Sequence, residues 1–520
     1  MSTANRIIKN TGFLYAKMGI TMFISLYTTR LILNSLGASD FGIYNIVGGA
    51  ISMLGFLNAA MASATQRFMS YSEGEGNKEK QKSIFNISFV LHLGISFVVG
   101  IALLIAGYFF FNGILNIPED RISAAQVVYG SLIVSTMFTV MTVPYDAAMN
   151  AHENMKYYAI MGIFESLLKL AVALTCVYTT SDKLILYGTL MACIPLVTLT
   201  IMRAYCHKHY EECVISPQKY WNKGLMNEMT GFAGWNFLGS ASSLIGNYGN
   251  GLAINHFYGT VLNAAQGITA QLGGTLLVLT NNMLKALNPV ITKTEGSGDR
   301  RKMLQATATG CKFSFYMLAI FTIPAIAEMP YLLKLWLKDV PPWAVIFSQL
   351  HLVRTLIEQT TITLGTALSA EGRIKRINQV TSVINLLPVT LTCILFSHGY
   401  SPIYMYVANI SILGILLSAI KVYFMKTHCG MTYRYYFSNI LSPILLTLIP
   451  TCLCSYLTVH FIKEGFPRLA LTLITSATTY ILAISYWGIT QQERTIFIQL
   501  INKIKKLLKG ENKITRYDNH

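Results

Sequence analysis

The residues best suited to chemistry in this sequence are charged side chains inside long apolar runs. A charge in a membrane span is costly, so it is retained mainly where it meets a substrate, an ion or another charge. Two acid–base pairs have i,i+4 spacing and can neutralise themselves on one helix face. The remaining cations can meet an anionic ligand or extend to the membrane interface. The residues are Lys17, Arg30, Lys312 and the pairs Glu165–Lys169 and Arg354–Glu358.

A second candidate site is a polar stripe within the run at 230–256. Its five members follow steps of four, three, four and three residues, which places them on one face of a helix. Such a stripe lines a wet cavity or joins helices through hydrogen bonds. We favour the cavity, because amides offer sugar hydroxyls both donors and acceptors. The stripe consists of Asn236, Ser240, Ser243, Asn247 and Asn250, and Gln266 and Gln271 extend its polar surface.

Signatures of catalysis are absent from the sequence. It has no DxD motif for a metal-bound nucleotide sugar, no GxxxxGK[ST] phosphate loop and no HExxH zinc motif. Its nine cysteines are scattered without a CxxC framework. We therefore predict no catalytic residue, no metal and no cofactor.

The elements that position these residues are predicted to be transmembrane helices. Charged residues make up 12% of the chain and the mean hydropathy is +0.47, whereas soluble proteins carry about 25% charge. A span needs about 20 apolar residues, and we count fourteen such runs, of which the fourth ends near residue 143 and the eighth near residue 284. We predict an all-α integral membrane protein with 14 transmembrane helices and no cleavable signal peptide.

The net charge of +17 would suggest a nucleic-acid partner for a soluble protein. Here the lysines and arginines accumulate in alternate loops, as expected if those loops lie in the cytoplasm. We therefore predict cytoplasmic N- and C-termini and no nucleic-acid partner.

Two charged octets mark an internal repeat. EGEGNKEK at 73–80 and EGSGDRRK at 295–302 begin 222 residues apart, and Gly37 and Gly259 keep the same offset. A second match, AMNAHENMK at 148–156 against ALSAEGRIK at 367–375, has an offset of 219. Six spans therefore repeat as six spans, a pattern typical of transporters with a site between the halves.

The predicted domain boundaries follow from this repeat. They are an N-terminal six-helix bundle at 1–206, a cytoplasmic linker at 207–228, a C-terminal six-helix bundle at 229–425, helices 13 and 14 at 426–490 and a basic tail at 491–520. We expect the linker to be solvated. The tail has apolar residues at helical spacing with lysines between them, which predicts an amphipathic helix on an anionic membrane surface. A disordered basic tail is the alternative.

Three stretches resemble polysaccharide flippases of the multidrug, oligosaccharidyl-lipid and polysaccharide exporter (MOP) superfamily. They are RLILNSLGASDFGIYNIVGG at 30–49, AMNAHENMKYYA at 148–159, and NHFYGTVLNAAQGITAQ at 255–271 followed by NPVITKTEGSGD at 288–299. The resemblance covers about residues 10–425. It implies two six-helix bundles in a V shape around a central cavity, plus two extra C-terminal helices.

The resemblance also implies a function. Such a protein flips polyprenyl-pyrophosphate-linked oligosaccharides across the bacterial inner membrane by alternating access, for surface polysaccharide assembly such as lipopolysaccharide, and is not an enzyme. Implied partners are the lipid-linked oligosaccharide and membrane lipids, with a polysaccharide polymerase and glycosyltransferases as further candidates. In related lipid flippases the extra helix pair accommodates the lipid tail.

Two features of the chain depart from this expectation or leave it open. Those relatives concentrate arginines in the cavity, whereas this chain offers mainly Lys17, Arg30 and Arg354. The alternative function is a cation-coupled multidrug antiporter, which needs a membrane carboxylate in the N-terminal half. Glu165 is the clear candidate for that carboxylate, and Lys169 is placed to neutralise it.

Overall fold

The computed structural model describes residues 3–52, 55–114, 117–337, 339–490 and 493–494, and all regular secondary structure in these ranges is helical. The helices of the first half are α1 (Thr3–Ser52), α2 (Gly55–Glu75), α3 (Lys78–Phe109), η1 (Phe110–Ile114), η2 (Glu119–Arg121), α4 (Ile122–Met141), α5 (Val143–Ala151), α6 (Met155–Tyr178) and α7 (Lys183–His209). After α8 (Pro217–Tyr220), the second half has α9 (Lys223–Tyr258), α10 (Thr260–Gly296), α11 (Arg300–Ala327), α12 (Met329–Trp336), α13 (Ala344–Gln359), α14 (Ile362–Glu371), α15 (Ile374–Ser397), α16 (Ile403–Asn409), η3 (Ile410–Leu416) and α17 (Leu417–Cys429). The chain continues with α18 (Tyr433–Tyr436), η4 (Phe437–Leu441), α19 (Ser442–Phe461), α20 (Phe466–Ala483) and η5 (Ile484–Gly488).

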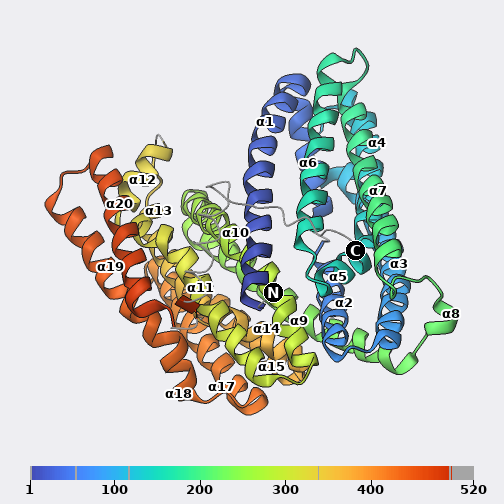
Figure 1. The fold of residues 1–520 in the computed structure, drawn as a ribbon. Helices are drawn as coiled ribbons and strands as arrows, with labels where there is room; N and C mark the ends of the chain where they lie inside the picture. Colours follow the sequence, from blue (N-terminus) through green and yellow to red (C-terminus); the bar gives the residue numbers. More distant parts are fainter. Residues whose placement is uncertain (1–2, 53–54, 115–116, 338, 491–492, 495–520) are drawn as a thin grey trace, which may run out of the picture.

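These helices form two lobes arranged as the arms of a V (Figure 1). The N-lobe contains α1–α7 and the C-lobe contains α9–α20. The arms meet where α2 packs against α9 and α10, which we name the closed end. The opposite end, which contains the turns at Gly37 and Gly259, is named the open end.

The internal repeat is visible in the backbone. Gly37 (φ 79°, ψ 169°) and Gly259 (φ 81°, ψ −173°) share a conformation that L side chains rarely adopt. Gly76 and Gly298, the fourth residues of the two octets, have φ of 70° and 76°. The second match behaves in the same way, because the positive-φ residues Glu153 and Gly372 occupy equivalent positions. Residues with positive φ at matching offsets therefore mark matching turns in the two halves, with glycine at five of these six positions.

Nine helices of the described residues are long and apolar enough to cross a membrane. The other predicted spans lie on helices that do not meet this length and hydropathy criterion. They are α1, α2, α9, α10 and α13–α14. Most of these are the helices through which the lobes face each other, and their Gly, Ser, Thr and Asn content lowers their hydropathy. The fold class is confirmed, whereas the count of 14 stays a prediction.

The α19–α20 hairpin is fastened to the C-lobe by a buried ion pair. Arg468 at the start of α20 donates from Nη2 to Glu328 Oε2 at 2.7 Å and from Nε to Oε1 at 3.0 Å. Thr472 Oγ1 donates to Glu328 Oε1 at 2.9 Å. Removing one member of such a pair leaves the other charge buried without a partner, which lowers the free energy of unfolding by about 3–5 kcal/mol.

Most residues of the linker between the lobes are exposed, as expected for a solvated segment, but its middle is packed onto the N-lobe. Asn86 donates to the carbonyl of Val214 at 2.7 Å and accepts from the backbone N–H of Ser216 at 2.7 Å. The side chains of Glu212 and Cys213 are buried. The predicted tail at 491–520 lies outside the described residues, apart from Glu493 and Arg494.

Candidate functional site

A cavity of about 740 Å³ lies between the lobes, and we name it the interlobe cavity. Its N-lobe wall is formed mainly by α1, and its C-lobe wall by α10 and α11. The Thr28 hydroxyl on this wall is buried without a hydrogen-bond partner in the described structure. Polar groups alternate with apolar ones, which suits an amphiphilic ligand. The polar lining residues are Thr21, Ser25, Thr28, Thr29, Ser166, Lys169 and Thr275.

Two lysines from different lobes converge on one aromatic ring. Lys17 Nζ on α1 lies 4.4 Å from the centroid of the Tyr158 ring, and Lys285 Nζ on α10 lies 3.5 Å from it. Asp146 on α5 attracts both lysines and lines a small cavity of about 130 Å³ together with Lys17, Tyr158 and Glu165. We name these five residues the lysine–aspartate cluster.

Sequence reasoning missed three members of this cluster. Asp146 and Lys285 were placed in loops, because the fourth and eighth apolar runs end near residues 143 and 284. In the structure α4 and α5 continue to Ala151 and α10 continues to Gly296, so both charges lie on helices. Tyr158 gave no signal, because one aromatic residue in a span is usually packing. The available clue was that Asp146 and Lys285 each lie within a few residues of the end of a run.

The other charges predicted as site residues have mixed positions. Lys169 lines the interlobe cavity, and its Nζ lies 2.7 Å from Glu165 Oε1. Arg354 Nε lies 3.2 Å from Glu358 Oε1. Arg30 is exposed and does not line the interlobe cavity.

The buried Lys312 forms an ion pair with Glu493, which follows the last helix of the chain that the structure describes. Its Nζ lies 2.8 Å from Glu493 Oε2, so it is paired rather than free for an anionic ligand.

The polar stripe on α9 is divided between two roles. At its ends, Asn236 donates to Ser63 Oγ at 3.4 Å across the lobes, and Asn250 donates to Asn409 Oδ1 at 3.3 Å. In its middle, Ser240 and Ser243 are half-buried and Asn247 is exposed. The ends therefore join helices, while the middle keeps the cavity interpretation as a proposal.

The two glutamines on α10 lie apart from the interlobe cavity lining. Gln266 has a buried Oε1 without a partner in the described ranges, and Gln271 is exposed. Neither lines the interlobe cavity or the small cavity of the lysine–aspartate cluster.

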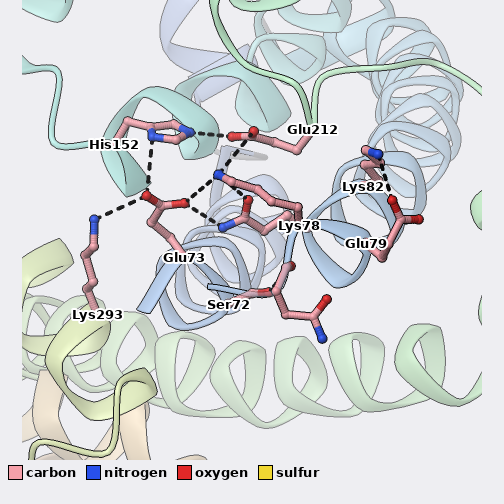
Figure 2. Close-up of polar contacts among 10 residues, drawn as sticks. Ser72, Glu73, Lys78, Glu79, Lys82, His152, Glu212 and Lys293 are labelled. Atoms are coloured by element: carbon pink, nitrogen blue, oxygen red, sulfur yellow. Dashed lines mark hydrogen bonds and ion pairs between the residues drawn. The ribbon is translucent and has the colours of Figure 1, made fainter. Parts of the chain in front are cut away.

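The closed end contains a second charged network, built on the first octet. Figure 2 shows His152 between the carboxylates of Glu73 and Glu212, at 3.5 Å and 2.5 Å. Lys293 Nζ of the C-lobe reaches Glu73 Oε1 at 3.3 Å, while Lys78 Nζ contacts Glu73 Oε2 at 3.2 Å. The His152 ring stacks on Tyr210 of the linker at 4.3 Å. This network ties the N-lobe, the linker and the C-lobe together.

The octet glycines allow the closed end to close. A methyl group on Gly74 would overlap the carbonyl oxygen of Lys293, and one on Gly296 would overlap the carbonyl oxygen of Tyr71. The two contacts are related by the offset of the internal repeat, so α2 and α10 cross with near two-fold symmetry. Only glycine permits this approach of backbone to backbone.

Further hydrogen bonds join side chains of the N-lobe to backbone carbonyls of the C-lobe. Arg67 on α2 donates from Nη2 to the Ala370 carbonyl at 2.8 Å and from Nε to the Ser369 carbonyl at 3.2 Å. Tyr15 on α1 donates to the Leu279 carbonyl on α10 at 2.7 Å. The Arg67 bonds and Glu73–Lys293 hold the lobes together at the closed end, and the Tyr15 bond joins them beside the interlobe cavity, which Leu279 lines.

The closed-end network should weaken in acid. Burial alone would raise the pKa of Glu212, but the hydrogen bond and charge of His152 lower it below the usual 4.5. A lowered carboxylate pKa contributes stability at neutral pH that is lost as the pH falls through the folded-state value. We expect the thermal unfolding midpoint of the purified protein to fall once the pH is lowered below about 4.5. In Glu212→Gln this fall of the midpoint should be smaller. An unchanged profile in the variant would contradict the role of Glu212.

Comparison with known proteins identifies the family. The sequence model of the family described as "Polysaccharide biosynthesis protein" matches residues 7–295, more than half of the chain. The chain belongs to this family. This family member is also 21% identical over 126 residues to the uncharacterized membrane protein EpsK of Bacillus subtilis (strain 168). That match spans 24% of each of the two chains.

Solved structures show the fold of this family member. The crystal structure of a MATE mutant superposes with a TM-score of 0.69 at 13% identity, over 82% of this chain and 96% of the other. A MOP superfamily transporter from Pyrococcus furiosus Vc1 (DSM3638), whose binding pocket is described as having reverse polarity, has a TM-score of 0.63 at 12% identity, over 81% and 96%. The protein is therefore a multi-pass membrane protein with the MOP-superfamily fold.

Proposed function

We propose that this protein flips a polyprenyl-pyrophosphate-linked oligosaccharide across the bacterial inner membrane, with the closed end in the cytoplasm. The observation that carries the proposal is that the structure offers separate environments for the three parts of such a lipid. The interlobe cavity offers hydroxyls, the lysine–aspartate cluster offers cations, and the C-lobe offers an apolar groove. Membership of the polysaccharide biosynthesis family supports the same substrate class.

The apolar groove supports binding of the polyprenyl tail. It has a volume of about 890 Å³ and lies between α11, α13, α17 and the α18–α19 segment. A polyprenyl tail that moves from the bilayer into this groove gains no hydrophobic free energy, because lipid tails are as apolar as the lining, so van der Waals packing against the groove would hold it. Its lining includes Phe315, Ile323, Val353, Leu356, Ile415, Val422, Ile444, Leu448 and Tyr456.

The two lysines support binding of the pyrophosphate. Lys17 and Lys285 belong to different lobes, so an anion between them contacts both lobes at once. Ammonium–phosphate hydrogen bonds are about twice as strong as neutral ones. Lys285 adds a cation to the few predicted for the cavity from the sequence, which partly offsets the shortage of arginines relative to the related lipid flippases.

The multidrug antiporter is less well supported. Its expected carboxylate, Glu165, lies 2.7 Å from Lys169, so its charge is already satisfied. Asp146 is a second N-lobe carboxylate, but it lies among two lysines. An exchange site for a lone cation needs an acid without such neighbours.

A genetic experiment tests the proposed function. Deletion of the gene should abolish a surface polysaccharide and leave lipid-linked oligosaccharide on the cytoplasmic face of the inner membrane. The measurement is mass spectrometry of extracted lipids, together with enzymatic access to the glycan in sealed vesicles of each orientation. Normal glycan combined with altered resistance to dyes or drugs would contradict the proposal and favour the antiporter.

A further inference from the structure

A second cavity, of about 400 Å³, lies beside the closed end, and we name it the basin. Its walls are α2 of the N-lobe and α10 and α14 of the C-lobe. Most of its lining residues carry hydroxyl or amide groups, among them Ser63, Gln66, Ser70, Asn288 and Thr366. The volume falls within the range of small-molecule sites.

One hydroxyl in the basin lacks a partner although it is buried. Ser70 is 1% exposed, and its Oγ makes no hydrogen bond within the described structure. Leaving a buried polar group unbonded costs about 1–3 kcal/mol. A hydroxyl held in this state at the edge of a cavity is suited to a ligand that can hydrogen-bond to it.

The amides of the basin are also available. Thr366 donates to Asn288 Oδ1 at 3.0 Å, which orients that amide. Neither the Asn288 NH₂ group nor the Gln66 side chain has a hydrogen-bond partner among the described residues. Free donors and acceptors side by side favour a polyhydroxylated ligand.

The basin does not favour a simple anion. Its one cation among the described residues, Arg67, already donates to the carbonyls of Ser369 and Ala370. The guanidinium also lies 4.6–5.4 Å from the ring centroids of Phe68, Tyr71 and Phe232. The polar groups left in the basin are therefore suited to hydrogen bonding with the hydroxyl groups of a ligand.

We propose that the basin binds sugar units of the transported oligosaccharide in addition to those that the interlobe cavity accepts, and this rests on the proposed function. Because the Arg67 bonds that frame the basin join the two lobes, the basin is complete only while the closed end is closed. A ligand that binds one of two conformations better shifts the population toward it. Sugar in the basin therefore stabilises the closed end.

The test compares two lipids on purified full-length protein in detergent. The probes are lipid-linked oligosaccharides extracted from the gene-deleted strain, and polyprenyl pyrophosphate without sugar. Ser70→Ala should weaken binding of the glycolipid about 5-fold, since one net hydrogen bond is worth about 1 kcal/mol. Gln66→Leu combined with Asn288→Leu should weaken it about 25-fold by the same arithmetic. Binding of the sugar-free lipid should not change.

The matched control is Thr322→Val, because the Thr322 hydroxyl is also buried and unbonded in the described residues but lies outside the basin. It should leave both affinities unchanged. Ser70→Ala should fold at least as well as the wild type, because it removes an unsatisfied group. Unchanged glycolipid affinity in both basin variants, or equal weakening for both lipids, would overturn the basin. Wild-type protein that binds neither lipid would overturn the proposed function itself.

Discussion

Gly74→Ala should open the closed end of the protein. The added methyl group overlaps the backbone carbonyl of Lys293 on the other lobe, and no side chain can rotate away to relieve it. Overpacking of this kind costs about 1–3 kcal/mol, which corresponds to roughly 5- to 150-fold in the equilibrium between closed and open lobes. Gly296→Ala should act in the same way through the Tyr71 carbonyl, and the double variant should show the largest effect.

Disulfide formation between Glu73→Cys and Lys293→Cys measures this equilibrium. The nine native cysteines are removed first. We expect the rate of cross-linking to fall at least about 5-fold in each glycine variant, together with transport. The control is Gly231→Ala, a glycine in α9 with no atom within 4 Å of the added methyl. Because alanine favours a helix over glycine by about 1 kcal/mol, a loss cannot come from the helix itself. Equal cross-linking in all variants would show that the crossing does not limit closure.

Lys285→Gln should reduce flipping by about 10-fold or more. A hydrogen bond to a charged group contributes about 1.5–3 kcal/mol, and Lys285 is one of the two cations over Tyr158. Lys17→Gln should have a similar effect from the other lobe. The measurement is the flipping rate in proteoliposomes, with the amount of folded protein determined alongside. Arg30→Gln is the control, because Arg30 is exposed and lies outside the interlobe cavity lining.

A double variant separates two roles for Lys285. If the lysine serves only to neutralise Asp146, then Asp146→Asn should restore the flipping that Lys285→Gln removes. If it binds the pyrophosphate, the double variant should remain as slow as the single one. Contacting residues give interaction energies of about 0.5–3 kcal/mol in such cycles, which is large enough to measure. Full restoration would remove Lys285 from the substrate site.

The parts of the fold that the sequence predicted are those with a local cause. Apolar runs form helices because a membrane leaves the backbone no other partners. The turns at Gly37 and Gly259 repeat because both need a φ near 80°. The ion pair Glu165–Lys169 lies on one helix turn and needs no partner from elsewhere.

The candidate site was harder to predict, for equally physical reasons. The stripe on α9 reads as a single cavity face, yet Asn236 and Asn250 bond to other helices. Helical spacing defines a face but not what covers that face. The ends of apolar runs placed Asp146 and Lys285 in loops, because helices extend past the hydrophobic run wherever another lobe covers them.

The sequence by itself therefore determined that this protein is helical, membrane-spanning and internally doubled, because hydropathy and glycine turns act over a few residues. The sequence also showed that the two octets are related, but it predicted them as two separate loops. Only the tertiary structure decided that the helix ends carrying the octets pack against each other, since Gly74 lies against the Lys293 carbonyl and Gly296 against the Tyr71 carbonyl across the lobes. The same holds for Lys17 and Lys285 over Tyr158. Such contacts depend on how two lobes cross, and no local pattern in the chain encodes a crossing.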